Sequence, residues 1–194
     1  MKSVLFLGSI LLLSACGSMQ SQVVKKNVAF DPGSQAQIRS YGSYGSDLIR
    51  IYPETDCAKW EGTKRNVVNR RFVNGLPRKV RNISIGIPPT ELSRKTEKDT
   101  GFVFRDSYRE MVVSANQPVV LDGAFSSQTR NHHYSCRVAA SFTPKAGEAY
   151  EVRYLSEEEG CDIEVYHIGH EEKDGVRQTK KLTANYCAKP GTSF

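Results

Sequence analysis

Apolar and polar residues alternate with a period of two along most of the chain beyond residue 35, and this pattern predicts β-strands rather than helices. The clearest case is Tyr134–Phe142, where every second side chain is apolar, aromatic or cysteine. Tyr150–Tyr154 alternates in the same way. After an acidic turn at 157–160, Cys161, Ile163 and Val165 share one face. We therefore expect three strands, each with one buried face.

Weaker versions of the same pattern predict further short strands. They lie at Ala36–Tyr41, Leu48–Tyr52, Lys79–Ile85, Tyr108–Ser114, Pro118–Ala124 and Val176–Thr183.

Turn signals separate these strands. A Tyr-Gly-Ser repeat at 41–46 is typical of a glycine-rich hairpin loop, and Asp174-Gly175 is typical of a tight hairpin. Thr90–Thr100 predicts one helical turn capped by Thr90, with too little apolar content for a core helix. The fold class that follows is all-β: an antiparallel two-sheet sandwich of about eight strands, immunoglobulin-like or transthyretin-like and stapled by disulfides.

The N-terminus has the pattern of an export signal, with Lys2 followed by an apolar run at 4–13. That run is about ten residues long, too short for a helix that crosses a ~30 Å hydrocarbon core. Leu13-Ser14-Ala15-Cys16 resembles a bacterial lipobox, and the resemblance implies acylation of Cys16. We expect a lipoprotein signal peptide at 1–15, the acylated cysteine with a flexible tether at 16–35, and a β-sandwich domain at 36–194.

The residue after the lipobox cysteine bears on the location. In the enterobacterial pattern an Asp at this position retains lipoproteins at the inner membrane, and this chain has Gly17. The expected location is the bacterial cell envelope, with the lipid anchor in the outer membrane and the folded body facing the periplasm.

Four cysteines remain once Cys16 is assigned to lipid, and an even number in an exported chain predicts two disulfides. In a simple hairpin, Cys136 and Cys161 would lie two strands apart, about 9–10 Å and beyond disulfide reach. If residues 143–149 instead arch between two sheets, these cysteines can meet across the core. The favoured pairing is Cys136–Cys161 with Cys57–Cys187, and the other two pairings stay open.

The net charge of +6 predicts a basic surface. Loss of residues 1–15 removes only Lys2, which leaves 26 basic and 21 acidic residues and a charge of +5. A solvated surface is one interpretation, and attraction to anionic lipid or cell-wall polymer through clusters such as Arg70-Arg71 is the other. The expected partners are the membrane, through the lipid anchor, and an envelope protein or anionic polymer. Nucleic acid is not expected for an exported protein.

Candidate chemistry is sparse. The sequence contains no Gly-x-Ser-x-Gly elbow, phosphate-binding glycine loop or His-Glu-x-x-His. His167-Ile-Gly-His170 resembles half of a metal motif, but residues three apart on a strand face opposite sides, so we expect the two imidazoles to diverge unless a turn intervenes. We predict no catalytic residues, no metal and no cofactor.

Aromatic residues near the first predicted hairpin offer a binding hypothesis. Exposed tyrosines can stack on sugars or anchor a protein contact, whereas core packing is the alternative for the single tryptophan. The candidates are Tyr41, Tyr44, Tyr52 and Trp60, with Arg70 and Arg71 as cations.

Several stretches together resemble a family of small uncharacterised bacterial lipoproteins. They are Ala36–Arg39 with Tyr52 and Cys57, Ile85–Thr90, Tyr108–Glu110, Ala115–Val119, Cys136, Phe142–Glu151 and Cys161–Val165. The family more often has Met at the position of Ile87, and the region around Cys187 matches less well. The resemblance implies a lipobox signal followed by a cysteine-containing all-β domain, and it carries over no functional residues.

The function predicted from the sequence is therefore a non-catalytic one, that of an envelope-associated binding or accessory lipoprotein. One alternative is an enzyme that acts on cell-wall or surface polymer, which needs two carboxyls, or a histidine and an acid, converging in a cleft. Another alternative is an inhibitor or immunity-type lipoprotein that caps another protein with a protruding loop, for which 88–104 is the candidate.

Overall fold

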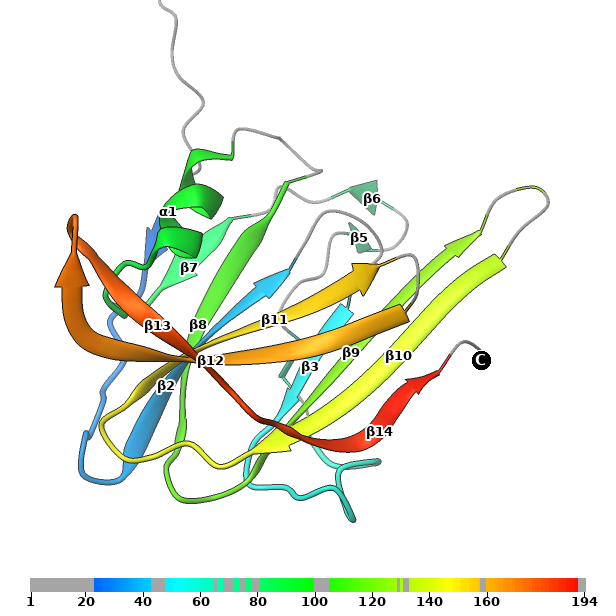
Figure 1. Ribbon diagram of the computed structural model, residues 1–194, viewed down its shortest axis with the longest axis horizontal. Helices are drawn as coiled ribbons and strands as arrows, with labels where there is room; N and C mark the ends of the chain where they lie inside the picture. The colour runs from blue at the N-terminus through cyan, green and yellow to red at the C-terminus, as the bar shows by residue number, and fades with distance from the viewer. Residues whose placement is uncertain are drawn as a thin grey trace, which may run out of the picture.

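The chain folds into two large β-sheets and one helix, as a computed structural model shows (Figure 1). Its described residues form fourteen strands, so the all-β prediction is confirmed at that level. The structure describes residues 23–42, 48–64, 66–67, 72–73, 76–77, 81–99, 105–128, 130, 133–157 and 160–191.

The larger sheet has seven strands. In spatial order they are β1 (Val23–Lys25), β7 (Asn82–Ser84), β8 (Ser107–Ser114), β2 (Gln35–Gly42), β11 (Ala149–Glu157), β12 (Gly160–Lys173) and β13 (Val176–Leu182).

The second sheet has five strands, and a small ribbon has two. The five are β14 (Asn185–Gly191), β10 (His133–Phe142), β9 (Val119–Gln128), β3 (Leu48–Tyr52) and β4 (Asn66–Val67), and the ribbon pairs β5 (Phe72–Val73) with β6 (Leu76–Pro77).

The strand pairing corrects two predictions. β2 and β3 do not form a hairpin, because β2 pairs with β8 and β11 in the larger sheet while β3 pairs with β9 and β4 in the other. The larger sheet is also mixed rather than antiparallel, since the pairs β1–β7, β7–β8 and β2–β11 are parallel. The chain leaves the larger sheet after β2 and returns to it after β10, which explains why β2 has distant neighbours and pairs in parallel with β11. β7 and β8 are consecutive but parallel because the connection through α1 carries the chain back before β8 begins.

The inner faces of the two sheets share one hydrophobic core. Ile38 of β2 and Val165 of β12 meet Leu121 of β9 and Val138 of β10 there. Gly123 of β9 leaves room for a side chain of the other sheet, because an added Cβ would stand 2.3 Å from the ring of Tyr154.

The structure forms both favoured disulfides. Cys136 pairs with Cys161 across the core, and Cys57 pairs with Cys187. The first pair confirms the arch: residues 143–149 carry the chain from β10 in one sheet to β11 in the other. The second pair fastens the segment after β3 to β14, a C-terminal strand that the alternation pattern did not predict.

Part of the expected tether belongs to the folded body. β1 pairs in parallel with β7, and the backbone N–H of Lys26 donates to the carbonyl of Ser84. Asp31 accepts hydrogen bonds from Gly33 and Ser34 in a turn that leads into β2. Within the described residues the folded body therefore includes Val23–Lys25 and the turn before β2, which the prediction assigned to the tether.

The helix α1 (Glu91–Lys98) is two turns long rather than one, and it starts at the predicted cap. The Thr90 side chain accepts from the Ser93 backbone N–H, and the Ser93 hydroxyl accepts from the Thr90 backbone N–H. α1 packs beside β8 and β13 on the outer face of the larger sheet (Figure 1). No helix among the described residues is long and apolar enough to span a bilayer.

Candidate functional site

The outer face of the larger sheet carries a row of polar residues set side by side by strand register. Arg39 on the central strand β2 lies opposite Glu110 of β8 on one side and Glu151 of β11 on the other. The row continues to Tyr166 of β12 and Lys181 of β13. We call these five residues the outer row. Opposite charges on neighbouring strands stabilise a sheet, and the register therefore explains why Arg39 lies between two glutamates.

Three residues of the outer row, Arg39, Glu110 and Glu151, are buried. Arg39 is 1% exposed, and its guanidinium lies 2.7 Å from Glu110 Oε1 and 3.0 Å from Glu151 Oε1. Burial alone would lower the pKa of Arg39, but the neighbouring acidic groups Tyr41, Glu110 and Glu151 outweigh that effect and raise it. Arg39 therefore stays charged inside the protein.

Glu110 holds in place the segment 84–90, which passes over Arg39. Its Oε2 accepts hydrogen bonds from the backbone N–H groups of Ile85, Gly86 and Ile87 and from the Ser84 hydroxyl, at 2.7–3.2 Å. Gly86 has φ of +106°, a conformation that strongly favours glycine. Arg39 donates to the carbonyls at the end of the same segment, those of Ile87 and Pro88.

Glu151 connects the buried ion pairs to the helix. Its Oε1 accepts from Arg39, from the Tyr41 hydroxyl at 2.5 Å and from the Thr90 hydroxyl at 2.5 Å. Burial raises the pKa of Tyr41, and the carboxylate of Glu151 raises it further, so Tyr41 remains a hydrogen-bond donor. Since Thr90 also caps α1, the buried charges fix where the helix begins.

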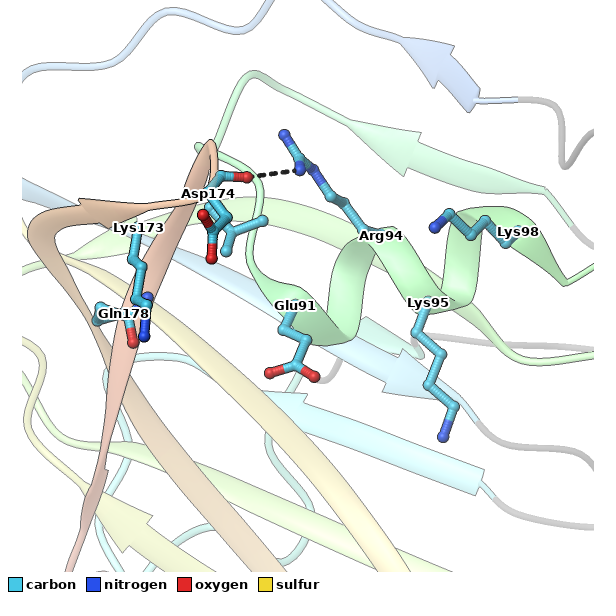
Figure 2. A pocket seen from close by; sticks show the side chains of 8 residues that line it. Glu91, Arg94, Lys95, Lys98, Lys173, Asp174 and Gln178 are labelled. Carbon is cyan, nitrogen blue, oxygen red and sulfur yellow. Dashed lines mark hydrogen bonds between the residues drawn. The ribbon is translucent and has the colours of Figure 1, made fainter.

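Two adjoining cavities lie between α1 and the β12–β13 hairpin, and we call them together the helix–hairpin groove. The larger has a volume of about 610 Å³ and the smaller about 350 Å³. They share Glu91, Lys95, Val176 and Gln178. Figure 2 shows the larger cavity, with side chains of α1 on one side and of the hairpin on the other.

Contacts at the hairpin's turn and at the start of β13 keep the groove in place. Arg94 of α1 donates to the carbonyls of Asp174 and Gly175 in the hairpin turn (Figure 2). The backbone N–H of Arg177 donates to the carbonyl of Pro89, just before the helix. Asp174 and Gly175 both have positive φ, which is the geometry of the predicted two-residue hairpin.

Cations outnumber acids along the larger cavity. Arg94, Lys95 and Lys98 come from α1 and Lys173 from β12, against Glu91 and Asp174. The three lysines form no ion pair with any residue that the structure describes. A concave surface with unpaired cations attracts anions, because the low-dielectric walls concentrate the field.

The two histidines of the His-x-x-His motif do not diverge, contrary to the prediction. Nε2 of His167 lies 2.5 Å from Oε2 of Glu148, and Nε2 of His170 lies 3.8 Å from the same oxygen. The pairing of β12 with β13 shifts register between Ile168 and Glu172, so strict alternation of side chains does not hold across His170. The hydrogen bond with His167 lowers the pKa of Glu148. Within the described chain no set of three or more His, Cys, Asp or Glu is arranged to hold a metal ion.

The aromatic binding platform does not form. Tyr41, Tyr52 and Trp60 are all buried, Tyr41 against Glu151 and the other two on the outer face of the smaller sheet. Tyr52 packs edge-on against Trp60, and Arg137 stacks over the indole at 4.9 Å. The packing alternative for Trp60 is therefore the right one. The remaining candidates, Cys16, Tyr44, Arg70 and Arg71, lie outside the described residues.

Sequence reasoning missed Arg39, Glu110, Glu151 and the groove. A charged residue on the outer face of a strand is expected to be solvated, and nothing local shows that a later segment covers it. One signal was present: stretches that carry the family resemblance contain Arg39, Ile85–Thr90, Glu110 and Glu151, and the structure brings them together in one network.

Comparison with known proteins gives no match: no family model, curated protein or solved structure corresponds to this chain. The resemblance to small bacterial lipoproteins stays a prediction.

We predict that Arg39→Met lowers the free energy of unfolding by roughly 3–5 kcal/mol, because it leaves two buried carboxylates without their cation. Lys59→Met, at an exposed lysine, is the control and should change stability by less than about 0.5 kcal/mol. Urea unfolding followed by circular dichroism measures both. A loss below about 1 kcal/mol for Arg39→Met would contradict the importance of the buried charges.

Proposed function

We propose that this chain is a lipid-anchored accessory protein of a bacterial cell envelope that binds anionic groups in its helix–hairpin groove and performs no chemistry on them. The observation that carries the proposal is the groove, where four cations face two acids across a cavity of about 610 Å³. That volume lies within the range of natural ligand sites.

Two further observations support an envelope location. The lipobox-like Leu13–Cys16 implies an acyl anchor, and Gly17 favours the outer membrane. The disulfides Cys57–Cys187 and Cys136–Cys161 suit an oxidising compartment, such as the periplasm.

Binding fits the groove better than catalysis does. Three carboxylates of the described residues line it. Glu151 is held by three donors at one oxygen, Glu91 lies in the first helical turn, where it complements the helix dipole, and Asp174 lies in the hairpin turn. Among the residues that the structure describes, the one histidine–acid contact at hydrogen-bond distance is that of His167 with Glu148, and neither residue lines the groove. The inhibitor hypothesis depended on a protruding loop over 88–104, and residues Glu91–Lys98 of that stretch form the docked helix α1 instead.

The anion-binding proposal predicts that the triple variant Lys95→Gln, Lys98→Gln, Lys173→Gln binds fluorescent inorganic polyphosphate about tenfold more weakly than the wild type, because each exposed lysine contributes up to about 1 kcal/mol. The measurement is fluorescence anisotropy with the full chain in detergent. Raising the ionic strength from about 0.01 M to about 0.15 M should also weaken wild-type binding, since the Debye length falls from about 30 Å to about 8 Å.

The matched control is Lys25→Gln, Lys26→Gln, Lys59→Gln, which removes the same charge from exposed lysines outside the groove. It should retain nearly the full affinity. If both triple variants lose affinity equally, net charge rather than the groove binds the anion. If the wild type does not bind polyphosphate at low salt, the proposed function is wrong.

For the anchor, we predict that bacteria fed an alkyne analogue of palmitate label the wild-type chain and leave Cys16→Ser unlabelled. The labelled protein should partition into the detergent phase, because stable attachment needs two or more acyl chains. Ser18→Ala, just beyond the lipobox, serves as the control and should be labelled normally. A wild-type chain that takes up no label contradicts the assignment of Cys16.

A further inference from the structure

Glu151 lines the smaller cavity, and one of its two carboxylate oxygens accepts no hydrogen bond from the described residues. The residue is 3% exposed, yet it lines the groove. All three of its hydrogen bonds, from Arg39, Tyr41 and Thr90, go to Oε1. Oε2 makes no hydrogen bond with the described part of the chain. Oε2 is not among the buried polar atoms that lack a partner, and Glu151 lines the cavity, so this oxygen is free to accept a hydrogen bond from water or from a ligand that brings a donor.

The positions of Glu151 and of the cations indicate which group a ligand must carry at each of its two ends. The smaller cavity, which contains Glu151, adjoins the larger one, and Lys95 lines both. Lys98 and Lys173 line only the larger cavity (Figure 2). One molecule that occupies both cavities therefore meets a hydrogen-bond acceptor at one end and unpaired cations at the other.

The donor that best suits Glu151 is a hydroxyl group rather than an ammonium group. Among its described lining residues, the smaller cavity has the cations Lys95, Arg153 and Arg177 and the carboxylates Glu91 and Glu151. Arg153 is already paired with Glu164, and Arg39 at 3.0 Å already compensates the charge of Glu151. An ammonium group would therefore gain little from the charge of Glu151, whereas a hydroxyl group needs only a hydrogen-bond acceptor.

The other groups around the smaller cavity also suit hydroxyl groups. Gln178 and Thr179 line it, and both side chains donate and accept hydrogen bonds. Tyr166 adds an aromatic ring, over which Arg153 stacks at 5.1 Å. Because Arg153 covers that ring, the polar wall alone favours a polyhydroxylated ligand over an extended alkyl chain.

We propose that the helix–hairpin groove binds a phosphate ester of a sugar, with a sugar hydroxyl donating to Glu151 Oε2 and the phosphate among Lys95, Lys98 and Lys173. This inference rests on the proposed anion-binding function and names its ligand class. Glu151 is then a specificity-determining residue, because it distinguishes a sugar phosphate from a bare anion.

The test is displacement of fluorescent polyphosphate from the full chain by four unlabelled compounds: glucose 6-phosphate, inorganic phosphate, phosphoethanolamine and glucose. We expect glucose 6-phosphate to displace the probe at about tenfold lower concentration than inorganic phosphate, the gain from one hydrogen bond to a charged acceptor. Phosphoethanolamine should resemble inorganic phosphate, and glucose should be the weakest. Because this series uses the wild-type protein, it does not depend on any variant folding.

The variant Glu151→Gln tests the residue directly. Its carbonyl oxygen can still accept from Arg39, Tyr41 and Thr90, while the amide N–H₂ replaces the free acceptor with a donor. We expect the ratio between the displacing concentrations of inorganic phosphate and glucose 6-phosphate to fall from about ten to about one, whatever the change in overall anion affinity. Glu172→Gln removes the same charge from an exposed hairpin residue outside both cavities and should keep the advantage.

Three results would overturn the sugar assignment: equal displacement by glucose 6-phosphate and inorganic phosphate, stronger displacement by phosphoethanolamine than by glucose 6-phosphate, or a folded Glu151→Gln that keeps the advantage. In each of these cases polyphosphate still binds, so anion binding would survive. Failure of polyphosphate itself to bind the wild type would refute the proposed function.

Discussion

The buried guanidinium of Arg39 is the constraint on which the outer face of the larger sheet depends. Strand register sets it between Glu110 and Glu151, and a charge placed there must be compensated on every side once water is excluded. Two carboxylates neutralise it, and two backbone carbonyls of the crossing segment accept its remaining donors. The segment 84–90 is thus held by specific polar contacts rather than by apolar packing alone.

The groove is a consequence of that arrangement. Thr90 donates to Glu151 and caps α1, so the helix begins where the buried network ends. The helix then meets the long β12–β13 hairpin, to which Arg94 joins it through two backbone carbonyls. The same carboxylate that compensates Arg39 also presents its second oxygen to the smaller cavity, which connects the stability of the fold to the chemistry of the proposed site.

Local patterns predicted what depends on neighbouring residues and failed where distant segments meet. Alternation placed β10 and β11 correctly, and the reach of a disulfide led from Cys136 and Cys161 to the arch between sheets. Alternation does not say which sheet a strand joins, so the separation of β2 from β3 was missed. It also treats each strand as regular, whereas the pairing of β12 shifts register between Ile168 and Glu172, where His167 and His170 both approach Glu148.

The site was harder to predict than the fold for the same reason. Arg39 and Glu151 lie on the outer faces of their strands, where charge usually means solvent, and only the covering segment 84–90 makes them buried. The aromatic residues in and after β3 were more conspicuous in the sequence. Tyr52 and Trp60 nevertheless pack on the outer face of the smaller sheet, beside the disulfide Cys57–Cys187. These two aromatic residues stand out in the sequence but are buried. The lysines of the groove, on α1 and β12, have no distinctive pattern in the sequence.

Amide hydrogen exchange on Glu110→Gln tests most directly whether buried charge holds the groove together. The account predicts that the amides of Ile85–Ile87 and of α1 exchange at least about tenfold faster than in the wild type, while those of β9 and β10 keep their protection, because the opening is local. Unchanged protection in 85–98 would contradict the account, since the segment and the helix would then be held without the Glu110 carboxylate.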